Sequence, residues 1–371
     1  MVTDNGVLPR QELKRLIRAK IITSSGRIDD SQLQPSSLDL TLGDEVFRLR
    51  AGFLPREGES IGEAVAELEK YKFPLKDDET NVLEPGATYL IRLRERLKLP
   101  KGFVGKANPK STTGRWDVFT RLLVDGHRSF DTIPEAYEGP IWIEVHPLTY
   151  NIKIRKGVAL NQLRIVHGES RIPQGDLRIL HEENPLVFDT DGKPMPSSKV
   201  RFDDDGILLT LDLDATIAAY EALINTENVD IGAPRGSLRK SREDFFRAIR
   251  KPKKGLLFLN PGSFYLLATR ERVSIPPGVC GTMVAYDPAS AEGRVHYAGF
   301  FDPGFGYGKK GEVRGTPATL EVRVLTPFRV VDGQPLCRMT FEKMRSNPDI
   351  LYRGNYRRRR GPELPKQLLV A

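Results

Sequence analysis

Cysteine is scarce in this chain. Only two of its 371 residues are cysteines, Cys280 and Cys337, and they lie in different segments. So few thiols argue against a disulfide-linked scaffold and suit a reducing compartment.

Long apolar runs are also missing. No stretch of about 18 apolar residues occurs, so no membrane-spanning segment is predicted. The first 15 residues, MVTDNGVLPRQELKR, contain no apolar region of the kind found in a secretory signal. We therefore expect a cytoplasmic protein, and its length allows two or three domains.

Positive charge is in excess. The formal net charge is +8, which favours an anionic partner such as a polyphosphate, a nucleic acid or a membrane surface. Part of the excess lies near the C-terminus, in Arg353 and in the four arginines 357–360. A basic tail alone is also typical of a solvated segment, so charge does not select among these partners.

The most informative feature is an internal repeat. Residues 83–105 read LEPGATYLIRLRERLKLPKGFVG, and residues 259–281 read LNPGSFYLLATRERVSIPPGVCG. At a constant offset of 176, 11 of the 23 positions are identical. The separation is too long for a solenoid repeat of about 20–50 residues, so it indicates two copies of a whole domain.

The pattern along the chain predicts a mainly β protein. Short alternating runs bounded by Gly and Pro are typical of a β-sandwich, jelly roll or barrel in each half. We expect domains at 1–170 and 201–371, joined by a connector rich in Pro, Gly and acidic residues at 171–200. The few predicted helices are 9–20, 59–72, 215–224 and 242–249.

Two further features occur in both halves. A Ser/Thr-rich loop, NPKSTTGR at 108–115, has the counterpart DPASAEGR at 287–294. Hydroxyls, backbone amides and basic side chains in such a loop can donate to phosphate oxygens. An Asp-containing turn, GHRSFD at 126–131, has the counterpart GFFDPG at 299–304.

A strand with one acid completes the pattern. In IWIEV at 141–145, alternation places Glu144 on the face opposite Ile143, and Glu321 occupies the same register in ATLEV at 318–322. A lone acid in this position would ordinarily lie on a solvated face. Its return downstream of the same loop favours a functional role.

Together these motifs resemble the dCTP deaminase family, a branch of the dUTPase-like fold, in its double-length form. The sequence contains SLDLTLG, KSTTGR, HRSFD and IWIEV in the order that the family shows, all within residues 37–145. The resemblance implies two tandem dUTPase-like domains, each a distorted β-barrel or jelly roll.

The resemblance also implies the reaction, hydrolytic deamination of dCTP to dUTP and ammonia in the synthesis of pyrimidine deoxynucleotides. The spacing of the five His and two Cys contains no zinc-deaminase motif, so we expect no zinc, and Mg²⁺ only on the triphosphate. Glu144 would be the general acid and base, with a pKa raised by burial beside Trp142.

Other site residues follow from the same resemblance. Ser111 and Arg115 would hold the water and orient the acid. The predicted substrate-binding residues are Lys110, Thr112, Gly114, His127, Arg128 and Asp131. In the second copy the corresponding candidates are Glu321, Ser290, Arg294 and Asp302.

The two copies depart from the family pattern in different ways. Lys110 stands where Arg is usual, and no Pro-Gly follows Asp131. The second copy has Glu292 inside the phosphate loop, and Phe300 and Phe301 where His and Arg are expected. We expect the first copy to carry the main chemistry, with the second either degenerate or completing a shared site.

In the family the C-terminal segment closes over the triphosphate. Tyr352, Arg353 and Asn355 are similar to this lid, so nucleic acid is a less favoured partner. Family members are homotrimers, and a trimer is expected here. Two alternatives remain open: a dUTP diphosphatase or bifunctional deaminase/diphosphatase, and a non-catalytic nucleotide- or nucleic-acid-binding protein.

Overall fold

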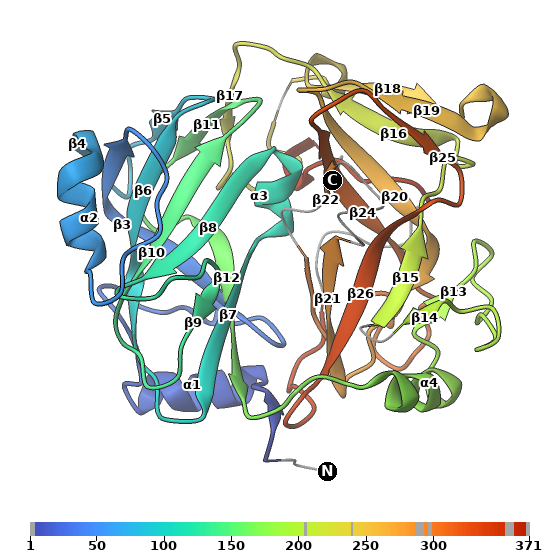
Figure 1. Ribbon diagram of the computed structural model, residues 1–371, viewed down its shortest axis with the longest axis horizontal. Coiled ribbons are helices and arrows are strands. Elements are labelled where there is room, and N and C mark those ends of the chain that lie inside the picture. Colours follow the sequence, from blue (N-terminus) through green and yellow to red (C-terminus); the bar gives the residue numbers. More distant parts are fainter. Residues whose placement is uncertain are drawn as a thin grey trace. The chain divides into compact units, whose positions relative to one another are not determined.

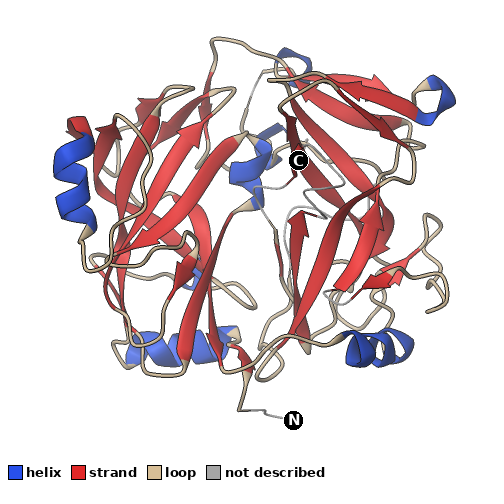
Figure 2. Cartoon of the chain, in the orientation of Figure 1, coloured by secondary structure: helices blue, strands red, loops and turns tan. Residues whose placement is uncertain are grey.

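The duplicated sequence folds into two β-sheet units. The computed structural model describes residues 4–203, 206–238, 240–285, 293–295, 299–352 and 360–368. Strands dominate, as the sequence predicted, and helices are few and short (Figure 2). Unit 1 contains Met1–Ser170 and Thr226–Pro234; unit 2 contains Arg171–Asn225 and Arg235–Ala371.

Among its described residues, unit 1 has three helices longer than a single 3-10 turn. They are α1 (Arg10–Arg18), α2 (Ile61–Leu68) and the short α3 (Ser111–Arg115). Its strands are β1 (Gly6–Val7), β2 (Ile22–Ser24), β3 (Leu38–Leu49), β4 (Glu69–Pro74), β5 (Asn81–Leu83), β6 (Thr88–Lys98), β7 (Phe103–Pro109), β8 (Val118–Val124), β9 (Thr132–Ile133), β10 (Glu138–Pro147), β11 (Asn151–Ile154), β12 (Ala159–His167) and β17 (Asn228–Asp230) (Figure 1).

Unit 2 has one α-helix among its described residues, α4 (Gln174–Glu183). Its strands are β13 (Val187–Phe188), β14 (Phe202–Asp203), β15 (Gly206–Thr210), β16 (Ile217–Ala222), β18 (Phe246–Arg250), β19 (Leu256–Leu259), β20 (Phe264–Val273), β21 (Val279–Ala285), β22 (Gly293–Val295), β23 (Phe300–Phe301), β24 (Thr316–Val324), β25 (Phe328–Val331) and β26 (Pro335–Lys343).

The sheets follow the same plan in both units. In unit 1 the order is β8-β10-β6-β3-β12-β7-β9. In unit 2 the matching strands form two sheets, β18-β16-β20-β24-β22 and β14-β15-β26-β21-β23. The short strand β17, which lies far along the chain, pairs in parallel with β11 of unit 1.

Buried polar contacts explain several identities of the repeat. Tyr89 accepts a hydrogen bond from the Glu84 amide at 3.1 Å, and Tyr265 accepts the equivalent bond from the Asn260 amide at 3.0 Å. Gly86 and Gly262 adopt nearly the same positive φ, at 75° and 77°, which favours glycine. The repeat therefore preserves a turn and its anchor.

The glutamate within the repeated segment, Glu95 in unit 1 and Glu271 in unit 2, has a structural role in each unit. Glu95 accepts hydrogen bonds from the backbone amide of Thr41 at 2.9 Å and from its hydroxyl at 2.7 Å. Glu271 accepts the same two bonds from Thr210, at 2.7 and 2.8 Å. Burial raises the pKa of Glu95, against the opposing effect of these bonds. This Thr–Glu clamp joins β3 to β6 in unit 1 and β15 to β20 in unit 2.

Two predicted helices are wrong. Residues 215–224 and 242–249 were expected to be helical. The structure instead has β16 and β18, which pair with each other, and β16 also pairs with β20. Only Arg242–Asp244 forms a short 3-10 turn. Sheet pairing overrides a modest helix preference of this kind. The helices predicted at 9–20 and 59–72 are present as α1 and α2.

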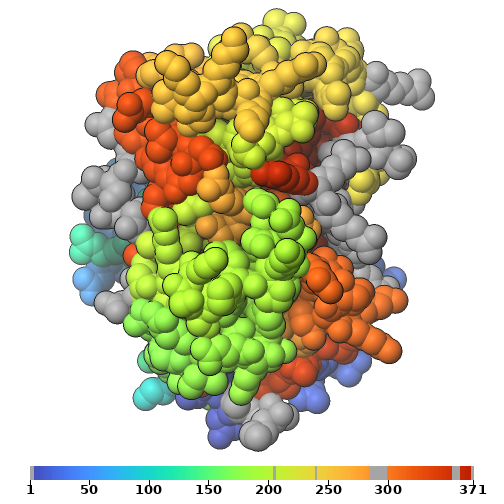
Figure 3. All heavy atoms as spheres, turned by 90° about the vertical axis from the view of Figure 1, so that its right-hand side faces the viewer, coloured from blue at the N-terminus to red at the C-terminus, as the bar shows by residue number. Residues whose placement is uncertain are grey.

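The segment expected as a connector is folded. Within 171–200, α4 and β13 form, and Leu177, Leu186 and Val187 are buried in the apolar core of unit 2. In Figure 3 the green and yellow-green residues of this region spread over the surface of that unit. No helix among the described residues is long and apolar enough to cross a membrane.

The Thr–Glu clamp should contribute measurably to stability in both units. Replacing Thr41 or Thr210 with Val removes a hydroxyl donor from a shielded carboxylate. We expect each change to lower the free energy of unfolding by about 1–3 kcal/mol in chemical denaturation. Thr80→Val, at an exposed position, is the control; equal stability of all three variants would contradict the clamp.

Candidate active site

The predicted phosphate loop forms the short helix α3, directly after β7. Thr113 is buried, and its hydroxyl donates to the Leu160 carbonyl of β12 at 2.8 Å. Thr112, Gly114 and Arg115 are also buried, whereas Ser111 is half-buried at the start of the helix. The fold therefore gathers these predicted residues in one short helical turn.

Lys110 precedes α3 and already has a carboxylate partner. Its Nζ forms an ion pair with Asp39, which is buried on β3 and also accepts a hydrogen bond from Gln34 at 3.4 Å. A phosphate bound by Lys110 would have to compete with Asp39. Sequence reasoning missed this pair, although Asp39 belongs to the SLDLTLG motif.

Glu144 is fully buried on β10 and is held by three neighbours. Arg121 lies directly opposite on β8, and its Nε donates to Oε1 at 3.0 Å. His146 Nε2 lies 2.7 Å from the same oxygen. The Phe53 amide donates to Oε2 at 3.3 Å. The solvated-face alternative is therefore wrong, and the sequence pattern gave no sign of Arg121 or Phe53 as partners.

The space around this carboxylate is filled. A methyl group added at Gly52 would lie 2.7 Å from Glu144 Oε2, so the backbone passes directly over the acid. Arg121 also stacks on Phe130, with its guanidinium carbon 3.9 Å from the ring centroid. Beside it, Trp142 packs in an apolar cluster with Leu49, Leu90, Leu123 and, from α2, Ile61 and Val65.

The predicted rise in the pKa of Glu144 is wrong. Burial does act to raise it, but the hydrogen bonds and charges of His146 and Arg121 outweigh burial and lower the pKa. A carboxylate with a lowered pKa is a weaker proton acceptor at neutral pH. In this arrangement Glu144 forms an ion pair with Arg121.

The other predicted substrate residues of the first copy lie in the turn between β8 and β9. His127 Nε2 is 2.8 Å from the Thr132 hydroxyl, and Arg128 is exposed. Asp131 has a φ of 60° and accepts a hydrogen bond from the Leu122 amide at 2.8 Å. Burial raises the pKa of Asp131 to about 7, against the effects of that bond and of Arg121.

The strand register establishes that the two acids are structural equivalents. Glu144 pairs with Leu90, and Glu321 pairs with Leu266, 176 positions further along. Glu321 is also buried, with 2% of its surface exposed. By the same comparison Trp142 is equivalent to Thr319: Trp142 pairs with position 92 and Thr319 with position 268, which are again 176 positions apart.

The register also corrects two predicted equivalences. The Ala107 amide donates to the Asp131 carbonyl, and the equivalent Met283 amide donates to the Gly299 carbonyl, so Asp131 corresponds to Gly299. Asp302 lies three positions after Gly299 and therefore corresponds to Pro134, not to Asp131. On β10, His146 lies two positions after Glu144 and pairs with Phe119. On β24, Arg323 lies two positions after Glu321 and pairs with Arg294. Arg294 therefore corresponds to Phe119 and not to Arg115. Insertions within these loops shift the motifs that the sequence alone had aligned.

The predicted lid is described only in part. The Tyr352 amide donates to the Pro303 carbonyl at 2.8 Å, and its ring lies 5.7 Å from that of Phe305. Tyr352 is thus docked on the turn that contains Asp302. Arg353 and Asn355, like Ser290 of the second loop, lie outside the described residues. Within the described ranges, no group of three or more His, Cys, Asp or Glu is placed to hold a metal ion.

Comparison with known proteins identifies the family. The model of the 2'-deoxycytidine 5'-triphosphate deaminase N-terminal domain matches residues 4–169, and that of its C-terminal domain matches residues 174–361. This chain belongs to the dCTP deaminase family. Its double length corresponds to these two domains.

Individual relatives agree. The crystal structure of 2'-deoxycytidine 5'-triphosphate deaminase from Agrobacterium tumefaciens superimposes with a TM-score of 0.85 and 34% identity, covering 93% of this chain and 97% of that one. A dCTP deaminase of Halorubrum lacusprofundi is 25% identical over 41% of this chain and 71% of its own length. A dUMP-forming dCTP deaminase of Streptomyces avermitilis is 31% identical over 40% of this chain and 74% of its own.

Asp131 should make stability depend on pH. Its folded pKa of about 7 exceeds the ordinary 3.8, so the stability it contributes is complete below pH 4 and is lost as the pH rises to 7. An asparagine at this position would keep the acceptor for Leu122 and tolerate the positive φ. We therefore expect Asp131→Asn to gain on the order of 1–3 kcal/mol relative to the wild type between pH 4 and pH 7. Parallel stability curves from denaturant melts would contradict the assignment.

Proposed function

We propose that this protein deaminates dCTP to dUTP and ammonia. The observation that carries the proposal is the similarity over nearly the whole chain to a crystallised protein named as a dCTP deaminase. The local geometry is compatible, because both units place a buried glutamate at the same position of the same sheet. The supporting element for the triphosphate is α3, with Ser111 and Arg115 beside Lys110.

In this mechanism one of the two equivalent glutamates takes a proton from water as the water oxygen adds to C4 of cytosine. This proton is passed to the ring nitrogen N3, where it stays in the product. The carboxylate then takes the second proton from the added hydroxyl and gives it to the amino group, which leaves as ammonia when the C4–N bond breaks, and the oxygen remains as the carbonyl of uracil. Acid–base assistance of this kind contributes about 10²–10⁴-fold. Mg²⁺ would accompany the triphosphate of the substrate.

A second candidate is a bifunctional reaction. Some relatives, including that of Streptomyces avermitilis and one from Methanobrevibacter smithii that is 28% identical, are named as dUMP-forming dCTP deaminases. A protein of that kind would also release pyrophosphate.

A direct assay separates these functions. We expect the purified protein, incubated with dCTP and Mg²⁺, to release ammonia; pyrophosphate measured in the same samples decides between dUTP and dUMP. Ammonia without pyrophosphate supports simple deamination, and both together support the bifunctional reaction. Binding of dCTP with neither product would leave a non-catalytic nucleotide-binding protein.

Ser111 provides a matched test of α3. Removing one positioned hydroxyl donor costs about 10²–10³-fold in kcat in comparable sites. Ser111→Ala should therefore slow ammonia release by that order. Ser25→Ala, at an exposed position outside the motifs, should not; equal rates for both variants would remove Ser111 from the mechanism.

The assembly is also a proposal. Isolated β units expose strand edges that are commonly paired or covered in oligomers, and the family resemblance implies sites between subunits. We expect sedimentation to give three times the mass of the single chain. A strictly monomeric species that still turns over dCTP would contradict the trimer.

A further inference from the structure

One strand edge is filled in unit 1 and, within the described residues, open in unit 2. In unit 1, β11 pairs on one side with β5 and on the other with β17, which comes from much later in the chain. Leu83 of β5 pairs with Ile152 of β11. The residues 176 positions further along, Leu259 and Phe328, pair in unit 2, so β19 and β25 are the matching strands (Figure 1). No described strand pairs with the second edge of β25.

The burial of equivalent side chains reflects this difference. Ile152 pairs with Val229 of β17, and both are fully buried. The equivalent of Ile152 is Phe328, which is only half-buried. Lys153, the next residue of β11, is half-buried, whereas its equivalent Arg329 is exposed. In the described part of unit 2, β25 therefore lacks the neighbour that covers β11.

The open edge offers unused backbone groups. The Asp332 amide donates to the Gly255 carbonyl at 3.0 Å, so every second residue of β25 back from there turns its N–H and C=O groups toward β19. Arg329 lies between two such residues and points its N–H and C=O outward. In unit 1 the equivalent Lys153 carbonyl accepts a bond from the Ile231 amide, directly after β17, at 3.3 Å. Arg329 thus presents one donor and one acceptor to an added strand.

The surroundings of this edge are strongly basic. The end of β18 and the turn that leads into β19, residues 245–255, hold five Lys or Arg and no acid. Three of the five, Arg250, Lys253 and Lys254, are exposed and form no ion pair within the described chain. Arg329 adds a fourth exposed cation. This concentration of positive charge favours an acidic partner.

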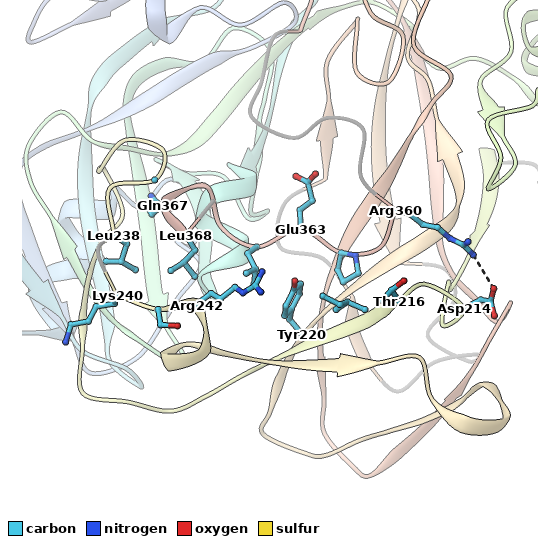
Figure 4. A pocket seen from close by; sticks show the side chains of 15 residues that line it. Asp214, Thr216, Tyr220, Leu238, Lys240, Arg242, Arg360, Glu363, Gln367 and Leu368 are labelled. Carbon is cyan, nitrogen blue, oxygen red and sulfur yellow. Dashed lines mark hydrogen bonds and ion pairs between the residues drawn. The ribbon is translucent and has the colours of Figure 1, made fainter. Parts of the chain in front are cut away.

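A pocket elsewhere on unit 2 suits an acidic partner less well. Its volume is about 800 Å³, and Arg242 and Arg360 are among the cations that line it. Arg242 is paired with Glu243 at 2.8 Å. Figure 4 shows Arg360 directed at Asp214, 3.4 Å away. The charge of these two cations is already compensated, whereas the charge beside β25 is not.

We propose that the open edge of β25 binds an extended acidic segment of a partner protein, which adds in parallel as β17 does in unit 1. In strand addition of this kind, main-chain hydrogen bonds provide affinity and alternate side chains provide specificity. By the register of β17, an apolar side chain of the partner packs beside Phe328, and the acid that follows it lies beside Arg329. β17 has this pattern itself, as NVD at 228–230.

A synthetic peptide of residues 225–234 is the probe, because this segment fills the equivalent edge of unit 1. We expect the labelled peptide to bind the full-length protein saturably in fluorescence anisotropy. A control peptide with Val229 and Asp230 exchanged has the same charge but turns its apolar side chain to the wrong face, and should bind at least about tenfold more weakly. Equal binding of the two peptides, or no saturable binding below about 1 mM, would contradict the inference.

Two variants at one position separate the backbone from the charge. Arg329→Ala and Arg329→Pro both remove the guanidinium, but only the proline removes the outward N–H. Proline is tolerated on edge strands, so the pairing with β19 should persist. We expect Arg329→Pro to bind the peptide about tenfold more weakly than Arg329→Ala, the worth of about one hydrogen bond. Equal affinities in folded variants would rule out strand addition.

Hydrogen exchange of the wild type needs no variant. Saturation with the peptide should slow exchange of the amides in residues 328–331. The amides in residues 151–154 serve as the internal control, because their edge is already paired with β17. Unchanged exchange at 328–331 in the saturated protein would place the peptide elsewhere and overturn the site.

The basic turn is tested by a pair of double variants. Replacing Lys253 and Lys254 with Gln should weaken binding of the peptide at least about threefold, as expected for exposed ion pairs. Replacing Lys309 and Lys310, another exposed pair in unit 2, should not. Equal effects would contradict an acidic partner. Tighter binding of a thymidine oligonucleotide that displaces the peptide would identify a nucleic-acid surface instead and overturn the inference.

Discussion

A carboxylate that is removed from water must be given donors or positive charge, and this requirement shapes both halves of the protein. In the Thr–Glu clamp, Glu95 and Glu271 receive neutral donors from Thr41 and Thr210. Glu144 receives charge as well, from Arg121. A buried acid beside a fixed cation keeps its charged form, because the cation offsets the loss of water around the carboxylate.

Duplication explains how such a difference can arise. The clamp, the Tyr89 and Tyr265 anchors and the glycine turns recur in both units, because each barrel needs them to form. The surroundings of the two equivalent glutamates differ more: Trp142 stands two positions before Glu144, and Thr319 takes that place before Glu321. The two copies therefore keep a common scaffold while their buried acids have different neighbours.

The sequence predicted the parts of this structure that depend on local pattern. Alternation correctly indicated the strands, and the offset of 176 correctly indicated two copies of one fold. It failed where long-range pairing decides: β16 and β18 resembled helices, and Asp302 was aligned with Asp131 although the register matches it to Pro134. The ion pair of Glu144 was invisible because Arg121 lies 23 positions away and faces it only across the sheet.

The course of the chain between the units has a practical consequence. It leaves unit 1 after Ser170, returns for residues 226–234, where β17 pairs with β11, and then leaves again. Any gene fragment that stops at the first crossing would encode a barrel with one strand missing and a bare edge at β11, prone to aggregate. Unit 1 thus depends on a segment that lies beyond the first part of unit 2, and a simple division of the coding sequence after Ser170 cannot give a complete first unit.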